Sequence, residues 1–476
     1  MAIYRFYATQ DNTITDGYGS VRSTRGTDAN MGASDVLEVY SLYGAFSSAS
    51  LGRSRVLLRF NTTEIAASRS VGTIPASGSA KFYLKLFNTP HVSTQAVDFK
   101  LTINAVSRSW DEGIGLDMDS YLDLGVSNWK TASYDGSTYT SWTATGSDFH
   151  NHPAYTASFT LGTENLEIDV SDIVEQWLDS TKSNYGFLIK LDSQYENGAG
   201  NAIASSSYFT KLFFGRTTEY YFKKPRLEVR WDDSNGDDRA NFYASSSLAT
   251  SDENSNNIYL YNYIKGQLRD IPPINSGTIY VKYFPALGLG SASISTPITG
   301  GWAATGTYTA SGELNTTASS VYDVWFVGGT EYHSGSEITV NYFSSSNYNP
   351  NPQYVINITN LRSTYGSEKA RFRVYVRDKD WSPTIYTTAS KTISTKIVEA
   401  AYYQIKRTID ELVVVAYGTG SGNDASTKLS YDSAGNYFDF ETNNLERDYQ
   451  YELSFVFYEN GKYTEQSEKF LFRVEY

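Results

Sequence analysis

Short segments in which apolar and polar side chains alternate recur along the whole chain, and each predicts a half-buried β-strand. In the first half these segments are residues 5–7, 36–40, 55–60, 80–86, 99–106, 187–191 and 225–231. Turn residues separate them, and helical periodicity is almost absent. Many short strands with so little helix are the pattern of a β-sandwich or jelly roll.

One stretch, residues 166–191, departs from this pattern and predicts strand, short helix, turn and strand. Leu166, Ile168 and Val170 alternate with polar neighbours, and Asp169 or Ser171 can cap the backbone that follows. Four apolar residues then recur at helical spacing: Ile173, Val174, Trp177 and Leu178. We expect this to be the one clear helix of the chain, with Trp177 as a core anchor.

The second half predicts two further β units. Segments 257–261, 278–283, 302–308, 321–327 and 337–342 suit an immunoglobulin-like sandwich. After residue 346, alternation continues in segments 354–358 and 372–376, and the apolar segment 412–417 predicts a fully buried strand. A hairpin turning at Asn460-Gly461 joins Leu453, Phe455 and Phe457 to a returning strand with Phe470, Phe472 and Val474.

The fold class predicted is therefore all-β: an N-terminal jelly-roll sandwich with one short helix, followed by immunoglobulin-like β-sandwich domains. We place the domains at residues 1–232, 233–345 and 346–476. The acidic segment 232–238 is the expected linker after the first domain.

Composition excludes several classes of function. The 476 residues include 40 tyrosines, no cysteine and a net charge of −13, without a cluster of Lys and Arg. Nucleic-acid binding is therefore not expected, and disulfides, thiol catalysis and Cys-ligated zinc are excluded. No signal peptide is visible at the N-terminus, and no apolar segment approaches the roughly 20 residues of a membrane helix, so we expect no membrane insertion.

Candidate chemistry is sparse. His150 and His152 supply only two imidazoles where zinc needs three or four ligands, and His91 and His333 lie far away in sequence. The acidic loop 111–119 fits either a calcium site or a solvated loop. Trp110, Trp129 and Trp142 fit either sugar stacking or core packing. We therefore nominate no catalytic, cofactor-binding or metal-binding residue, and we expect neither a cofactor nor an enzyme.

Several motifs in residues 1–232 resemble those of the DNRLRE family, a jelly-roll module of microbial surfaces related to carbohydrate-binding modules. The resemblance rests on residues 8–14, 30–39, 53–61, 109–112, 126–129 and the helix stretch with Trp177. Asn61 stands where that family often has Asp. The resemblance implies a jelly-roll fold, favours core packing for Trp110 and Trp129, and covers about half of the chain.

The whole chain, with three predicted β-sandwich units in series and no visible catalytic set, resembles a structural protein of tailed bacteriophages. This implies a structural or adhesive component of the virion (tail, neck, fibre or decoration), assembled in the host cytoplasm. The implied partners are other virion proteins, further copies of the chain in a homo-oligomer, and host-surface polysaccharide. The alternative is a carbohydrate-binding protein of a cell surface or secreted fraction, and a polysaccharide-degrading enzyme is the weakest hypothesis because no acid–base pair is nominated.

Overall fold

The structure, a computed structural model, describes residues 2–18, 25–43, 51–90, 96–117, 126–196, 207–286, 292–345, 349–385, 395–422 and 424–475. Strands hold 47% of the residues and helices 8%, which confirms the all-β prediction. The chain divides into two compact units, residues 3–231 and residues 232–476 together with the first two residues. Within the described ranges, no helix is long and apolar enough to cross a membrane.

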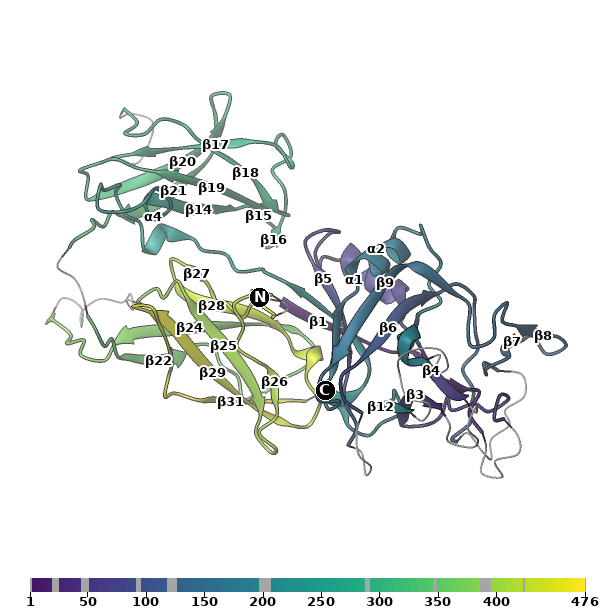
Figure 1. Cartoon of the computed structure of the whole chain (residues 1–476). Helices are drawn as coiled ribbons and strands as arrows, with labels where there is room; N and C mark the ends of the chain where they lie inside the picture. Colours follow the sequence, from purple (N-terminus) through teal and green to yellow (C-terminus); the bar gives the residue numbers. More distant parts are fainter. Residues whose placement is uncertain are drawn as a thin grey trace. The chain divides into compact units, whose positions relative to one another are not determined.

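The first unit is a jelly roll built from two antiparallel sheets (Figure 1). Its strands are β1 (Ala2–Tyr7), β2 (Gln10–Thr15), β3 (Val36–Tyr43), β4 (Leu51–Arg59), β5 (Lys81–Leu86), β6 (Phe99–Val106), β7 (Thr131–Tyr134), β8 (Tyr139–Ser141), β9 (Phe149–Phe159), β10 (Leu166–Asp169), β11 (Phe187–Leu191), β12 (Ser207–Phe214) and β13 (Arg226–Trp231). Its helices are α1 (Thr62–Ser70), α2 (Ser171–Leu178), α3 (Ser193–Glu196) and the 3-10 turn η1 (Tyr221–Lys223).

Strand order identifies the jelly roll. One sheet runs β1-β13-β5-β10, and the other contains the series β4-β11-β6-β9. Among these eight strands the chain changes sheet at every connection except the one from β6 to β9. Such crossing connections between two antiparallel sheets are the Greek-key pattern of a jelly roll. Strands β2, β3 and β12 extend the second sheet beside β4.

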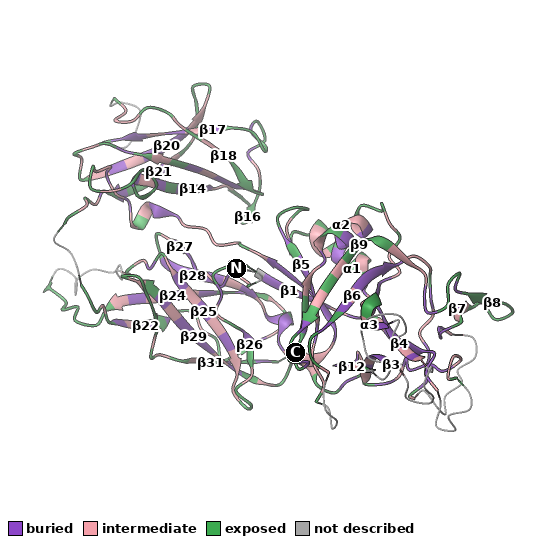
Figure 2. Cartoon of the chain, viewed as in Figure 1, coloured by how far each residue is buried: buried purple, intermediate pink, exposed green. Residues whose placement is uncertain are grey.

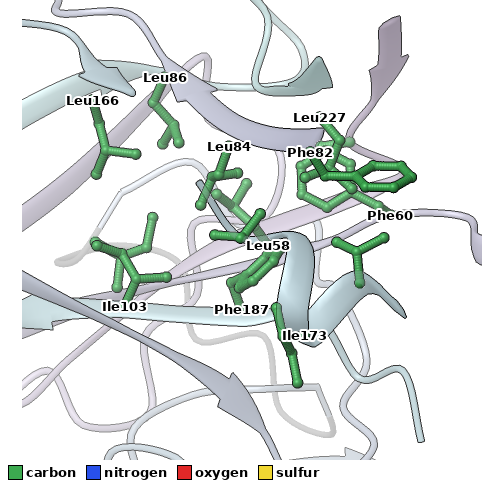
Figure 3. Close-up of a cluster of buried hydrophobic side chains, with 14 of the residues drawn as sticks. Leu58, Phe60, Phe82, Leu84, Leu86, Ile103, Leu166, Ile173, Phe187 and Leu227 are labelled. Carbon is green, nitrogen blue, oxygen red and sulfur yellow. The ribbon is translucent and has the colours of Figure 1, made fainter. Parts of the chain in front are cut away.

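The main core lies between these two sheets (Figure 3). Leu84 and Leu227 reach it from the first sheet, and Leu58 and Ile103 reach it from the second. Helix α2 covers one side with Ile173, Val174 and Trp177, all buried, so the predicted helix and its core tryptophan are both confirmed. Asp169 Oδ1 accepts the Ser171 N–H at the start of this helix.

The expectation of a single helix is wrong, because α1 packs beside α2 (Figure 1). Asn61 caps α1 through its Oδ1, which accepts the Thr63 N–H at 3.1 Å. Arg69 near the end of α1 forms a bidentate ion pair with Glu175 of α2. Ile65 is the only buried residue of α1, which is why its helical periodicity in the sequence is weak.

The second unit begins with a β domain built on one antiparallel sheet ordered β14-β19-β18-β17-β20-β21. Its elements are η2 (Asp238–Ala240), α4 (Ser251–Asn254), β14 (Ser255–Tyr261), β15 (Tyr263–Ile264), β16 (Gln267–Leu268), β17 (Ile279–Phe284), β18 (Ile298–Ala304), β19 (Thr307–Glu313), β20 (Ser320–Val327) and β21 (Thr330–Thr339). The single strand expected over residues 302–308 is wrong. The chain turns there at Gly306, whose positive φ suits a tight turn between β18 and β19.

The remaining strands form an immunoglobulin-like sandwich with sheets β22-β24-β28-β27 and β23-β31-β29-β25-β26. They are β22 (Tyr354–Ile358), β23 (Thr364–Tyr365), β24 (Lys369–Asp378), β25 (Ala401–Arg407), β26 (Val413–Val415), β27 (Ser430–Asp432), β28 (Gly435–Glu441), β29 (Gln450–Glu459), β30 (Lys462–Glu465) and β31 (Phe470–Val474), with the 3-10 turn η3 (Thr442–Asn444). In immunoglobulin lettering these sheets correspond to A-B-E-D and G-F-C-C′. Tyr451, near the start of β29, donates its hydroxyl to the Glu446 carbonyl at 2.8 Å, which is the tyrosine corner of such folds.

Two strand predictions in this last sandwich change in detail. The segment 412–417 is not fully buried, because β26 is an edge strand and Val413 is 44% exposed. The hairpin at Asn460-Gly461 is present, and both turn residues have positive φ. Its returning chain is split into β30 and β31, which pair with different parts of β29. Figure 2 shows the buried residues along the strands and the exposed ones mainly in loops and at edges.

The acidic segment 232–238 is not a solvated linker along its whole length. Gly236 pairs with Tyr431 of β27, whose N–H donates to the Asn235 carbonyl and whose carbonyl accepts the Asp237 N–H, both at 2.9 Å. Asp237 and Asp238 are buried, and the Tyr431 hydroxyl donates to Asp238 at 2.8 Å. The segment therefore lies along β27 as a short strand-like addition, and its acidic side chains have specific partners.

Candidate functional site

The motifs that carry the family resemblance meet in one buried polar network of the jelly roll. Asn12 Nδ2 donates to the Ser127 carbonyl at 2.9 Å, and Asn30 Nδ2 donates to the same oxygen at 2.9 Å. The Asn30 Oδ1 accepts the N–H groups of Gly32 and Gly115. Segments far apart in the sequence are thus joined by amide side chains that bond mainly to backbone groups, with one further bond from Asn12 Nδ2 to the Ser127 hydroxyl at 2.8 Å, which is a structural arrangement.

Two glycines beside this network are needed for close approach. A Cβ on Gly32 would lie 2.4 Å from the Gly113 carbonyl oxygen. A Cβ on Gly113 would lie 2.0 Å from the Asn30 Oδ1. Only glycine lets the two loops touch at this distance.

Beside this network, Asp11 is a buried carboxylic acid that sequence reasoning did not nominate. Its Oδ2 accepts the Arg216 N–H at 2.6 Å, while its Oδ1 is buried without a hydrogen bond and lies 3.9 Å from Arg216 Nε. Burial raises the pKa of Asp11 to about 7, and the hydrogen bond from the Arg216 backbone opposes this rise. Its neighbours in the sequence, Gln10 and Asn12, are also polar, so no pattern in the sequence indicates that Asp11 is buried.

The acidic loop is held by protein partners where the structure describes it. Glu112 accepts hydrogen bonds from the Arg216 guanidinium and from the Asp11 N–H. Asp111 Oδ2 accepts the Tyr134 N–H at 3.2 Å. Asp119 lies outside the described residues. Within those residues no group of three or more His, Asp or Glu side chains could hold a metal ion.

The histidines are not brought together. His150 and His152 lie within β9, where the pairing with β6 changes register between Phe149 and Ala154. Burial and the nearby Lys182 lower the pKa of His150. His333 is exposed on β21, and His91 lies outside the described residues.

The three tryptophans pack a second core and do not form a sugar platform. Trp110, Trp129 and Trp142 are only 1%, 3% and 5% exposed. They cover the outer face of the second sheet, where Leu57 and Leu188 point, because neighbouring strand residues alternate between faces. Core packing, which the resemblance favours for Trp110 and Trp129, is therefore found for all three, and the sugar-stacking alternative through them is wrong.

One cavity, of about 470 Å³, opens beside α2. Lys81 of β5, Tyr155 of β9 and Asp169 of β10 line it, together with Asp172 and Glu175 of α2. Residues 166–178 thus supply about half of the side chains that line this cavity. No motif in the sequence indicates the cavity. The side chains come from separate strands and one helix, so only the fold reveals their proximity.

The groups in this cavity are mostly tied to neighbours. The Tyr155 hydroxyl accepts the Ile173 N–H at 3.2 Å, and burial raises the pKa of Tyr155 to about 12. Asp169 accepts hydrogen bonds from Ser171 and lies 3.7 Å from Lys81 Nζ. Asp172 is exposed in the first turn of α2. The cavity therefore offers carboxylates, a hydroxyl and an aromatic edge, which suit hydrogen bonding to a neutral polyhydroxyl ligand.

Comparisons with known proteins give only distant likenesses. No family model matches the chain, and no curated protein matches its sequence. A marsupial T cell receptor matches 46% of this chain and 68% of its own at 10% identity and a TM-score of 0.15. The Yersinia pseudotuberculosis adhesin InvE matches 46% and 54% at 16% identity and a TM-score of 0.15.

A chimeric titin Z1Z2 tandem matches 47% of this chain and 91% of its own, at 11% identity and a TM-score of 0.15. At such TM-scores these likenesses carry no conclusion about activity or partners. The chain is a multidomain β-sandwich protein with distant immunoglobulin-like neighbours. The resemblance to the DNRLRE family stays a prediction.

Proposed function

We propose that this chain is a structural and adhesive component of a bacteriophage particle and has no enzymatic activity. The observation that carries the proposal is that the buried polar side chains bond to other parts of the same domain. Asp11, Asn12, Asn30 and Glu112 all hold strands and loops of the jelly roll together. A chain of β-sandwiches whose buried polar groups serve internal cohesion suits assembly better than catalysis. The assignment to a virion rests on the resemblance of this series of β-sandwich units to structural proteins of bacteriophages.

The test is to search for the chain in purified particles by mass spectrometry and imaging. We expect it in many copies per particle, and we expect it to stay with the particles through washing. A matched preparation from cells in which the gene is deleted is the control. Absence from particles, with the chain found instead in an envelope or culture fraction, would contradict the proposal.

A second candidate function, carbohydrate binding, is favoured by the cavity beside α2. Its hydroxyl and carboxylate groups, with the amide of Gln176 that also lines it, match the hydrogen-bonding needs of sugar hydroxyls. Glycan-array binding by the full chain should weaken on Asp172→Ala or Gln176→Ala. Asp35→Ala changes an equally exposed aspartate outside the cavity and should leave binding unchanged. Equal binding by all variants would remove this cavity as the sugar site.

A further inference from the structure

Lys211, in the middle of β12, is a lysine whose side chain is completely buried. It is 0% exposed, and its Nζ lies among three oxygens. Asn88 Oδ1 is at 2.6 Å, the Gly162 carbonyl at 2.6 Å and the Glu164 carbonyl at 2.7 Å. An ammonium group, which has three donors, is fully satisfied by this set.

The remaining surroundings of Lys211 are apolar. Its Nζ lies 4.9 Å from the centre of the Phe159 ring and 5.2 Å from that of Phe213. Burial lowers the pKa of Lys211 to about 8, with the charge of Glu164 acting in the opposite direction. Near neutral pH a fraction of the molecules therefore carries a neutral, nucleophilic amine at this position.

Loss of one proton from the Lys211 ammonium leaves a lone pair on Nζ, and this lone pair can attack an electrophilic carbon. The neutral amine keeps two N–H donors, and the backbone carbonyls of Gly162 and Glu164 can take both. Its lone pair is then left for the third neighbour, the carboxamide of Asn88. The Asn88 Cγ lies within about 4 Å of Nζ, since it is bonded to the oxygen that Nζ contacts.

The backbone also fixes this pair. The Thr89 N–H donates to the Leu212 carbonyl at 3.1 Å, and the Phe214 N–H donates to the Phe87 carbonyl at 3.0 Å. These bonds lie on both sides of Asn88, and they hold the segment after β5 against the part of β12 that directly follows Lys211. Fixed reactants at short distance raise the effective concentration of an intramolecular reaction.

We propose that Lys211 and Asn88 form an intramolecular isopeptide bond. The lone pair of Nζ attacks Asn88 Cγ, and a new C–N bond forms while the bond from Cγ to Nδ2 breaks. The proton lost by Nζ ends on Nδ2, which leaves as ammonia, so no oxidant or cofactor is required. The product covalently joins β12 of the second sheet to the chain that leaves β5 of the first.

The test is the mass of the full chain, measured after denaturation. We expect a mass lower than that of the sequence by one ammonia. Trypsin should release a branched peptide that joins residues 86–100 to residues 191–216, since an acylated Lys211 is not cleaved. Both signals should be absent in Asn88→Ala and in Lys211→Arg, and both should remain in the control Lys190→Arg.

The decisive result is the branched peptide, because deamidation-type loss of ammonia elsewhere changes the mass without joining two peptides. The full chain is first incubated at a pH above the pKa of Lys211. If its mass then still equals that of the sequence, or if the branched peptide is still missing, the proposal is overturned. In that case Lys211 is a buried amine whose N–H groups donate hydrogen bonds to the three neighbouring oxygens. These measurements on the unaltered chain do not depend on the folding of any variant.

Discussion

Trp177 fills the core beneath α2 without using its polar atom. Its ring lies 4.8 Å from that of Phe187, and its Nε1 is buried with no hydrogen-bond partner among the described residues. Trp177→Ala should lower the free energy of unfolding of the jelly roll by about 3–5 kcal/mol, through lost burial and a cavity. Trp177→Phe should cost less than Trp177→Ala, because it removes less apolar volume and no hydrogen bond is lost.

The measurement is hydrogen exchange in β5 and β11 with increasing denaturant. Trp110→Phe is the matched contrast, since Trp110 Nε1 donates to the Tyr185 carbonyl at 2.8 Å and this bond would be lost. Unchanged protection in Trp177→Ala would show that α2 does not close the core.

Asp11 makes the stability of the jelly roll depend on pH. Its pKa in the fold is about 7, above the value of roughly 3.9 in an unfolded chain, so the folded state binds the proton more tightly. The stabilisation by the protonated form is complete below the unfolded pKa and is lost as pH rises through about 7. The unit should therefore melt at a lower temperature above pH 7 than at mildly acidic pH.

Asp11→Asn should remove that dependence, because the amide cannot ionise and its oxygen can still accept the Arg216 N–H. The quantity to compare is the difference in melting temperature between variant and parent across the pH range, so other titrating groups cancel. Asp35→Asn, on the surface, is the control. A constant difference from pH 4 to 8 would exclude Asp11 as the source.

At the scale of elements, α1 depends on its cap more than on burial. Only Ile65 of this helix is buried, and Asn61 satisfies one of the free N–H groups at its start. Asn61→Ala should lower stability by about 0.5–2 kcal/mol, whereas Asn61→Asp should be nearly neutral because both residues cap well. Thermal unfolding checks this, with Thr63→Ala as the control. An equal loss for both Asn61 variants would contradict the capping role.

Elements with strong periodicity could be predicted from the sequence, and weakly patterned ones could not. Strands β6 and β11 were predicted with the bounds they have in the structure. Helix α1 was missed because one buried residue leaves no amphipathic pattern. Strands β18 and β19 merged into one in the sequence, since nothing but Gly306 marks the turn between them.

At the scale of the whole molecule, the sequence predicted the fold class better than the sites. The cavity beside α2 gathers Lys81, Tyr155 and Asp172 from separate segments, and no spacing in the chain reveals such proximity. The pair of Lys211 and Asn88 lies 123 residues apart and was invisible for the same reason. Conversely, the tryptophans were weighed as ligand platforms because the sequence does not show which face of a sheet they cover.

The acidic segment 232–238 should behave as a docked strand and not as an open connection. Tyr431 holds it through backbone pairing and through its hydroxyl bond to Asp238, and a Cβ on Gly236 would lie 2.6 Å from that hydroxyl. A protease that cuts before aspartate should therefore leave the bonds before Asp237 and Asp238 intact in the native chain. Tyr431→Phe should speed cutting there by about tenfold or more, because it removes a hydrogen bond to a charged group.

Tyr458→Phe is the matched control for that experiment, since Tyr458 is 40% exposed and distant in sequence from the segment. Rapid native cleavage at Asp237, equal in the parent and in Tyr431→Phe, would mean that the segment opens on its own and that its contacts with β27 add nothing to its order. Protection that is lost only in Tyr431→Phe would instead show that the hydroxyl of this tyrosine keeps the acidic segment docked on β27. Burial raises the pKa of Asp237 to about 6, so the docked segment binds a proton more tightly than the open one. Protection from cleavage should therefore be stronger at pH 5 than at pH 8.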